Sequence, residues 1–232
     1  ESSFNTGIID IFIASIDHEI ATGLDTILHC DAFKAQESLW TSLEYLLKHC
    51  PANKNIKIDT LNISKSALRQ DFKDNSLSDS LLFKCIHTNA YDMPGADPYG
   101  FMLLADYFSA DKQDLDTLIS CAQVAKSAHC PIITATNSEF FNKDNATQVS
   151  EIKDYNEHFE RPEYVHWQAF RNNPLSRYVC FTFPRFLLRM PYGQSNQTNL
   201  FSYVESAGDN DDENLLWGNA AFAMASNMLE SF

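Results

Sequence analysis

The sequence is poor in glycine, and its few glycines form none of the loops that bind phosphate. Only seven glycines occur in 232 residues, and they produce neither a G-x-G-x-x-G fingerprint nor a Walker loop. A G-x-S-x-G nucleophile elbow is also missing. The usual signatures of nucleotide binding and serine hydrolysis are therefore absent, and no catalytic or cofactor-binding residue is predicted.

The sequence also lacks the spacings that bind metals. No C-x-x-C pair occurs among its six cysteines, and the stretch "DNDDEN" (209–214) lacks the glycine and the final glutamate of a calcium loop. Neighbouring residues on a helix point about 100° apart, so adjacent His-Cys pairs rarely share one metal ion. Three such pairs are present: His29-Cys30, His49-Cys50 and His129-Cys130. No metal site is predicted, and the cysteines are expected to be mostly buried free thiols.

Basic residues are scarce too. The chain has 17 Lys and Arg against 31 Asp and Glu, for a formal net charge of −14. A surface of this kind repels phosphate backbones and anionic membranes, so neither nucleic acid nor membrane is an expected partner. The longest apolar cluster, "GIIDIFIASI", is interrupted by Asp10 and is shorter than the roughly 20 residues of a membrane-spanning helix. Without a basic, signal-like start, a cytoplasmic location is expected.

Helical and strand periodicities alternate along the chain. Apolar residues recur at helical spacing over 8–28 (Ile9, Ile13, Ile16, Ile20, Leu24 and Ile27), and a second helix over 32–49 ends before Pro51. Further helices are predicted at 65–72, 78–88, 161–171 and from an Asp111 cap to about 129, with strands at 56–63, 101–108, 131–136 and 177–183. This order predicts an α/β fold with a mixed β-sheet of about four or more strands and helices on its faces.

One domain spanning 1–232 is expected. Its parts are a helical start (8–50), an α/β core (54–193), an acidic loop (208–214) and a C-terminal helix (215–232). No internal repeat suggests an array.

Two arginines lie inside an apolar run. The segment "SRYVCFTFPRFLLRMPYG" (176–193) places Arg185 and Arg189 four residues apart among Phe, Leu and Met. Cationic groups in such a setting need acidic partners, because an unpaired buried charge costs too much free energy. The run is therefore predicted to be architectural, with partners on this chain favoured over partners on another.

Several blocks, in order, resemble one family, the large subunit of the bacterial type VI secretion contractile sheath (TssC or VipB). The blocks are "FKAQESLWTSLEYLL" (33–47), "IKIDTLNISKSAL" (56–68), "SLLFKCIHTNAYDMPGADPYGFMLLADY" (80–107), "AQVAKSAHCPIITATNSEFF" (122–141), "EYVHWQAFRNNPLSRYVCFTFPRFLLRMPYG" (163–193) and "LLWGNAAFAMA" (215–225). The most specific are "W-x-x-F-R…SRYV…PR-x-LLR-x-PYG" and "LWGNAA-F". They contain Trp167, Phe170, Arg171, Arg177, Tyr178, Pro184, Pro191, Tyr192, Gly193, Trp217, Gly218 and Asn219.

The resemblance implies a structural role without a cofactor. Members of the family pair with a small sheath subunit (TssB or VipA), and the heterodimers build a tubule around an inner tube of hexamers. Contraction of the tubule propels effectors out of the cell. Further copies of the large subunit and the inner-tube protein are implied partners. So is a recycling unfoldase, which grips an N-terminal segment that this sequence is expected to lack.

The sequence departs from the family pattern in two ways. It has "AYDMPGADP" where the family has a glycine-richer loop, and it resembles a fragment without the N-terminal arm and the C-terminal portion.

The first helix is a candidate interface. Its apolar face is broader than one packing contact needs, so Ile9, Phe12, Ile13, Ile16 and Ile20 are predicted to contact the small subunit. The alternative is packing in the chain's own core. Two other functions remain open: a cytoplasmic α/β hydrolase or transferase with an unrecognised site, and a binding module for a small acidic or apolar ligand.

Overall fold

The computed structural model describes residues 6–52, 54–193, 203–206 and 215–231. The described residues contain both helices and strands, so the α/β class is confirmed. They divide into two compact units, whereas one domain is predicted from the sequence. Unit 1 comprises residues up to Glu44 together with Phe186–Gly218, and unit 2 comprises Tyr45–Arg185 and Asn219 onward.

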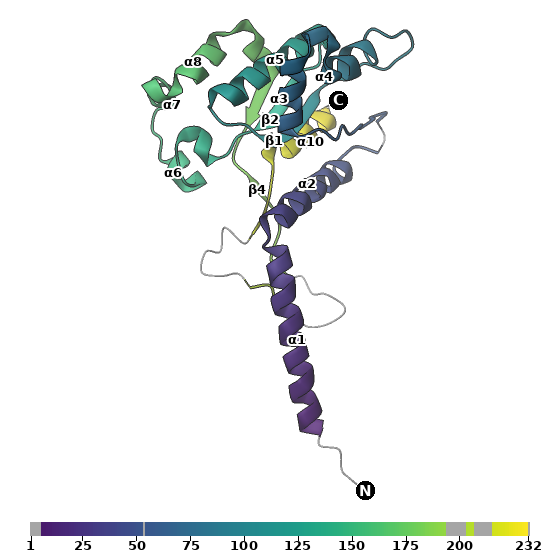
Figure 1. The fold of residues 1–232 in the computed structure, drawn as a ribbon, viewed down its shortest axis with the longest axis vertical. Coiled ribbons are helices and arrows are strands. Elements are labelled where there is room, and N and C mark those ends of the chain that lie inside the picture. The colour runs from purple at the N-terminus through teal and green to yellow at the C-terminus, as the bar shows by residue number, and fades with distance from the viewer. Residues whose placement is uncertain (1–5, 53, 194–202, 207–214, 232) are drawn as a thin grey trace. The chain divides into compact units, whose positions relative to one another are not determined.

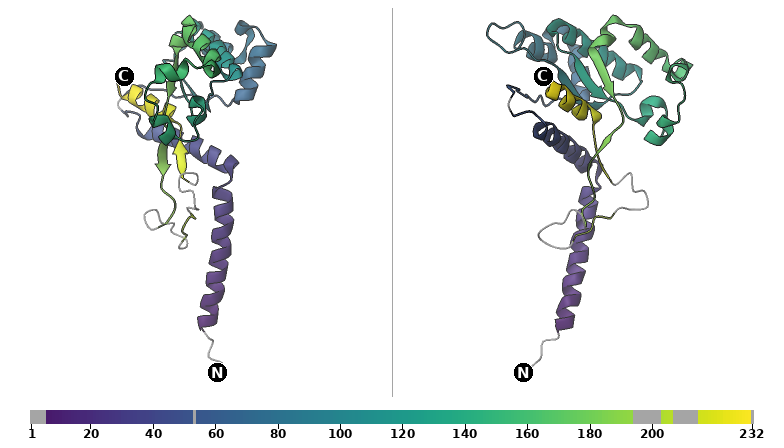
Figure 2. Two further views of the ribbon diagram at one scale, coloured as in Figure 1. Left: turned by 90° about the vertical axis from the view of Figure 1, so that its left-hand side faces the viewer. Right: turned by 180° about the vertical axis from the view of Figure 1, so that it is seen from behind.

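Unit 1 is built from two helices and a two-stranded sheet. Helix α1 (Thr6–Leu28) is unbroken, and α2 (Asp31–Lys48) begins in this unit and continues past Glu44 (Figure 1). Strands β4 (Phe186–Arg189) and β5 (Leu216–Gly218) pair antiparallel, with Phe186 opposite Gly218 and Leu187 opposite Trp217. The two strands lie side by side in Figure 2. They were not expected as a pair, because β5 has only three residues and fell inside the predicted C-terminal helix.

Unit 2 is centred on a three-stranded parallel sheet. Strands β1 (Met102–Tyr107), β2 (Ile132–Ala135) and β3 (Val179–Thr182) lie in the order β1-β2-β3. All four residues of β2 are buried, as expected for the central strand of a parallel sheet that is covered on both faces. Helix α5 (Lys112–Ala128) and helix α10 (Ala220–Ser231) lie on either side of the strands in Figure 1.

The main core cluster of unit 2 lies beneath α5. Cys121, Val124, Ala125 and Ala128 pack there with Ile132 of β2, and the cluster also takes in Leu68, Leu82, Met102 and Cys130. Small side chains on α5 allow the helix to approach the sheet closely, at the amino ends of β1 and β2 where Met102 and Ile132 lie.

Short helices complete unit 2. They are α3 (Lys65–Asp74), η1 (Leu77–Asp79), α4 (Leu81–Phe83), η2 (Lys84–Thr88), η3 (Ser138–Phe141), α6 (Ala146–Ser150), α7 (Tyr155–Phe159), η4 (Pro162–Tyr164), α8 (Val165–Asn172) and η5 (Pro174–Tyr178). Ser64 caps α3 as its sequence suggests, since its side chain accepts a hydrogen bond from Ala67 N at 3.1 Å. The predicted helix 78–88 is present as a succession of 3₁₀, α and π turns.

Three local expectations differ from the structure. The predicted strand 56–63 is wrong: Ile56 and Ile58 are half-buried in alternation, but the segment pairs with no described strand. Asp111 occupies the cap position of α5 without a side-chain capping hydrogen bond. Helix α10 begins at Ala220 rather than at 215, because Leu216–Gly218 form β5.

The strands also divide differently from the expectation of one sheet. The five described strands form a parallel sheet in unit 2 and an antiparallel pair in unit 1. The acidic loop 208–214 lies outside the described residues.

Candidate functional site

Helix α1 carries an exposed apolar surface. Every residue from Gly7 to Ile20 is exposed, including all five predicted interface residues. Ile9, Phe12, Ile13, Ile16 and Ile20 are 42%, 65%, 50%, 55% and 46% exposed. Contiguous apolar surface of this kind is unusual on a protein that acts alone, and it marks interaction sites. The described chain therefore leaves this surface available to another molecule.

The C-terminal end of α1 is held by a neighbouring segment of unit 1. Tyr203 donates a hydrogen bond through its hydroxyl to the Asp25 carboxylate, and Ser206 N donates to the same oxygen at 3.2 Å. Just past the helix, His29 Nε2 lies 3.2 Å from Glu205 Oε1. Thus α1 is fixed at one end, and the exposed surface lies toward the other.

Arg189 joins three segments of unit 1. Its Nε donates to Glu37 Oε1 on α2 at 2.7 Å, and its Nη1 donates to Glu205 Oε2 at 2.8 Å. The guanidinium also lies over the Tyr192 ring, with Cζ 4.4 Å from the centroid. The Glu205 side chain is only 2% exposed, and Tyr192 N donates to its Oε2 at 2.9 Å. Both carboxylates are therefore matched by donors, as a buried ion network requires.

The protonation of this cluster follows from its contacts. Burial alone would lower the pKa of Arg189, but the hydrogen bonds to Glu37 and Glu205 outweigh it and raise that pKa above its ordinary value. Burial and the hydrogen bond to Asp25 raise the pKa of Tyr203. The arginine stays charged and the tyrosine stays neutral at physiological pH, so Arg189 keeps its ion pairs with Glu37 and Glu205.

Arg185 belongs to the other unit. It lies in unit 2 at the end of the β3 segment, near enough to Tyr107 to oppose the rise that burial produces in the pKa of that phenol. The preceding Phe183-Pro184 bond is cis. The two arginines of the run are therefore separated between the two units.

Gly218 is required by close packing within unit 1. A Cβ at this position would lie 2.9 Å from the side chains of both Leu188 and Phe186. Beside it, Trp217 O accepts a hydrogen bond from Ser38 Oγ at 2.6 Å, which ties β5 to α2. At Gly193, which follows Pro191 and Tyr192, a Cβ would lie 3.8 Å from Val204 Cγ1. This is an ordinary contact distance, so packing does not require glycine there.

We predict that Gly218→Ala destabilises the β4–β5 pair by about 1–3 kcal/mol, the usual cost of overpacking. Amide hydrogen exchange of residues 186–189 should become faster in this variant. Gly23→Ala is the matched control, because a Cβ at Gly23 meets nothing within 4 Å. Alanine there is expected to favour the helix by about 1 kcal/mol. Equal exchange in Gly218→Ala and in the unmodified protein would contradict the packing explanation.

Asn219 begins the second unit's last helix. Its Oδ1 accepts from Ala221 N at 2.8 Å, and its Nδ2 donates to Ala105 O in β1 at 2.8 Å. The side chain is 4% exposed. One asparagine therefore caps α10 and joins it to the sheet.

The tryptophan block forms an aromatic cluster in unit 2. Trp167 stacks on Phe170 with centroids 5.5 Å apart, and it meets Phe140 and Phe181 edge-to-face at 4.9 and 5.4 Å. Arg171 is exposed, and Arg177 lies over the Tyr178 ring at 5.1 Å. These residues fix α8 against β3, which is a packing role.

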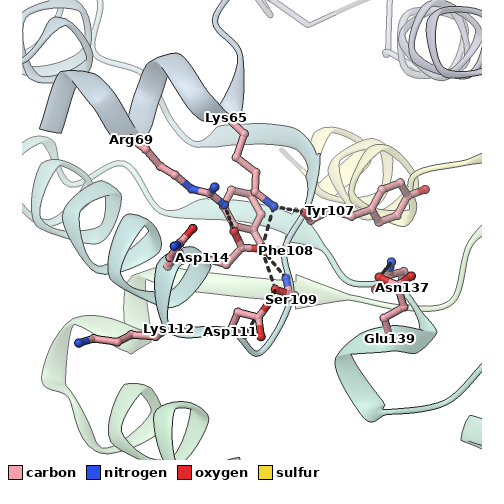
Figure 3. A pocket seen from close by; sticks show the side chains of 11 residues that line it. Lys65, Arg69, Tyr107, Phe108, Ser109, Asp111, Lys112, Asp114, Asn137 and Glu139 are labelled. Carbon is pink, nitrogen blue, oxygen red and sulfur yellow. Dashed lines mark hydrogen bonds and ion pairs between the residues drawn. The ribbon is translucent and has the colours of Figure 1, made fainter. Parts of the chain in front are cut away.

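A polar pocket lies at the carboxyl ends of β1 and β2 (Figure 3). It has a volume of about 540 Å³ and is lined by α3, the start of α5 and the residues that follow the two strands. Lys65 Nζ donates to Asp114 Oδ2 at 2.7 Å and to Tyr107 O at 2.8 Å, and Arg69 pairs with Asp114 Oδ1. Ser109 donates to Asp114 Oδ2 from both its backbone N and its hydroxyl, at 2.8 and 3.0 Å.

This position is where α/β proteins commonly bind ligands, so the protonation and contacts of its side chains bear on any catalytic role of this pocket. Burial alone would raise the pKa of Asp114, but the hydrogen bonds from Lys65 and Ser109 outweigh it and lower that pKa. The carboxylate is ionised and already engaged by two cations. No histidine or cysteine lines the pocket to activate the Ser109 hydroxyl. The arrangement fastens α3 to the start of α5.

Asp114→Asn is expected to destabilise unit 2 by about 2 kcal/mol, because Lys65 and Arg69 lose their counter-charge. Asp116→Asn, at an exposed position of the same helix, is the control. Since the folded pKa of Asp114 is lowered, its stabilisation is present above the unfolded pKa of about 4. It is lost as the pH falls below that value through the folded pKa. Chemical denaturation between pH 7 and pH 3 measures both effects. If both variants unfold at the same denaturant concentration, the charge cluster is not stabilising.

The described residues hold no group of three or more possible metal ligands. All six cysteines are free thiols. Cys121 and Cys130 are buried, which raises the pKa of each to about 12, while Cys30 and Cys180 are exposed. Exposure of the last two differs from the expectation of mostly buried thiols. No described helix combines the length and apolar character needed to cross a membrane.

Three carboxylates with central roles had no distinctive signal in the sequence. Glu37, Glu205 and Asp114 lie 152, 16 and 45 or 49 residues from the cations that they bind. The sequence shows that Arg189 needs acidic partners, but only the fold determines which of 31 acidic residues supply them.

Comparisons with known proteins agree with the resemblance of the sequence blocks. Residues 10–232 match the family model VipB, described as "EvpB/VC_A0108, tail sheath N-terminal domain". The chain is 32% identical over 228 residues to the type VI secretion system sheath protein TssC1 of Pseudomonas aeruginosa. The match covers 97% of this chain and 46% of that relative, so the chain spans about half of the relative's length.

Proposed function

The chain belongs to the VipB family of tail sheath proteins, and from this membership we propose that it is a structural subunit of a type VI secretion sheath. In this role it pairs with the small sheath subunit. The pairs, with further copies of the chain, form a cytoplasmic tubule around the inner-tube hexamers. Contraction of the tubule propels effectors out of the bacterial cell.

The observation that carries the pairing proposal is the exposed apolar surface of α1. Ile9, Phe12, Ile13, Ile16 and Ile20 have no cover in the described chain. Burying one such side chain contributes about 1.5–3 kcal/mol, so five of them supply ample free energy for a specific interface. The small subunit covers this surface with an amphipathic element, as helices do when they dock in a groove.

A structural rather than catalytic role is part of the proposal. The polar pocket of unit 2 uses its central carboxylate for ion pairs with Lys65 and Arg69. Nothing in the described site favours the alternatives of a hydrolase, a transferase or a small-ligand binding module. The packing of Trp167 and Gly218, and the ion pairs of Arg189, fit a subunit that must keep its shape under mechanical load.

Assembly tests this function directly. The full-length protein is co-expressed with the small sheath subunit of the same bacterium, and the purified material is imaged by negative-stain electron microscopy. Tubules that require both proteins are expected. A full-length protein that stays monomeric in the presence of the small subunit would contradict the proposal.

A further inference from the structure

The exposed surface of α1 has the period of a coiled-coil seam. Ile9, Ile13, Ile16, Ile20, Gly23 and Ile27 follow one another at spacings of 4, 3, 4, 3 and 4. This is the alternation of d and a positions in a heptad, with Ile9 at d and Ile13 at a. All six residues are exposed. The exposed stripe therefore runs through Gly23 and not through Leu24, the residue predicted for it from the sequence.

The same helix uses a different face to contact its own chain. From Ala21 onward, the partly buried residues are Ala21, Leu24, Asp25 and Leu28. At 100° per residue these lie between about 70° and 170° around the helix from the mean direction of Ile20, Gly23 and Ile27, and Leu24 is the nearest to the seam. Attachment of α1 within unit 1 therefore covers a neighbouring face and leaves the a and d residues themselves exposed.

Half of the positions that flank the seam are acidic. In this register Asp10 and Asp17 occupy e positions and Glu19 occupies a g position, where coiled-coil partners exchange salt bridges. The other flanking positions hold Phe12, Leu24 and Thr26. Residues 6–28 contain four acidic side chains and no Lys or Arg. Two copies of α1 would therefore bring eight carboxylates together with no cation to offset them, which disfavours self-pairing.

A partner would also stabilise the helical conformation of the seam. Residues 7–20 span about 20 Å of α1 and extend beyond the end that Tyr203 and Ser206 hold, and helices without packing partners are marginal in water. Six of these 14 residues are isoleucine, and β-branched side chains have reduced helix propensity. No described side chain covers these isoleucines, so the described chain contributes little packing to this part of the helix.

From these observations we propose that α1 is one helix of an intermolecular coiled coil whose partner helix has an apolar a/d seam flanked by Lys or Arg. This inference deepens the proposed pairing with the small sheath subunit and rests on it. The acidic residues at the flanks disfavour a second copy of α1 and favour a basic-flanked helix, while the isoleucine seam fixes the register.

Three synthetic peptides test the chemistry without the small subunit. The first has three heptads with isoleucine at a and leucine at d, and lysine at e and g. The second replaces those lysines by glutamate, and the third scrambles the first so that composition and charge remain but the heptad is lost. Binding to the purified protein is measured at 0.15 M salt, with hydrogen exchange of residues 7–20 as the local readout.

The heptad peptide with lysine flanks is expected to bind at least about tenfold more tightly than either other peptide and to slow exchange over 7–20. Asp10→Lys/Asp17→Lys/Glu19→Lys should reverse the preference in favour of the glutamate peptide. The control Asp92→Lys/Asp116→Lys/Glu151→Lys changes the net charge equally at exposed sites elsewhere and should keep the original preference.

Equal binding of the lysine heptad and its scrambled form would overturn the inference, since it would reduce the attraction to net charge alone. Binding that leaves exchange over 7–20 unchanged would also overturn it. Neither result depends on whether the protein forms sheaths. Conversely, a failure to form tubules with the small subunit would count against the proposed function and leave the peptide preference standing.

Discussion

Arg189→Met is expected to destabilise unit 1 by about 3–5 kcal/mol, the usual cost of removing one partner from a buried ion pair. Methionine preserves much of the side-chain volume but leaves Glu205 without its main counter-charge. The Glu205 side chain is 2% exposed and cannot turn to water without opening the unit. The loss should appear in every segment that Arg189 joins.

Local hydrogen exchange is the suitable measurement, because it reports the opening of each unit separately. Amides of residues 186–189 and 203–206 should exchange faster in Arg189→Met, whereas those of β2 should not change. Arg171→Met removes an exposed arginine and is the control. Glu205→Gln combined with Arg189→Met should be less destabilising than the sum of the single changes. A variant within 0.5 kcal/mol of the unmodified protein would show that the network is not structural.

Ile13→Asp/Ile16→Asp is expected to weaken binding of the small sheath subunit by at least about a hundredfold. Each isoleucine contributes about 1.5–3 kcal/mol when buried, and a buried carboxylate without a partner adds a further penalty. The protein's own denaturation midpoint should stay the same, because the two side chains are 50% and 55% exposed. Isothermal titration or co-purification with the small subunit provides the affinity.

The matched control places aspartate at two exposed apolar positions of unit 2. Leu81 and Val165 are 47% and 55% exposed, close to the values for Ile13 and Ile16. Leu81→Asp/Val165→Asp should bind the small subunit normally. If a folded Ile13→Asp/Ile16→Asp variant binds the small subunit with unchanged affinity, α1 does not form the contact with that subunit.

Much of the architecture could be predicted from sequence periodicity. The spacing of isoleucines predicted a helix from residue 8, and α1 begins two residues earlier, at Thr6. Pro51 correctly predicted that α2 ends before it. The parallel strands were predictable because β1, β2 and β3 are short apolar runs between helices, and burial on both faces produces such runs. These features depend on local pattern, which a single sequence contains.

Features that depend on distant partners could not be predicted. Ile56 and Ile58 alternate like a strand, but a strand also needs a neighbour with free hydrogen-bonding groups, and none is present among the described residues. Leu216–Gly218 resembles the start of a helix until Phe186 and Leu187 pair with it. The partners of Arg189 likewise depend on how α2 and residues 203–206 come together.

The sequence indicated which residues of α1 form an apolar stripe, but it did not indicate whether that stripe is exposed or buried. The pattern of α1 is equally compatible with packing in the chain's own core, and it did not predict that Gly7 to Ile20 are all exposed among the described residues. The heptad register could not be assigned from the sequence, because leucine at position 24 fits an apolar stripe better than glycine at position 23. In the structure Gly23 is exposed and Leu24 is partly buried, so Gly23 continues the exposed seam.

Hydrogen exchange of α1 in the presence and absence of the small sheath subunit tests the central claim most directly. The account predicts that amides of residues 7–20 exchange rapidly in the free protein, because this helix has no cover, and at least about tenfold more slowly in the complex. A stable complex in which residues 7–20 exchange as fast as in the free protein would contradict it.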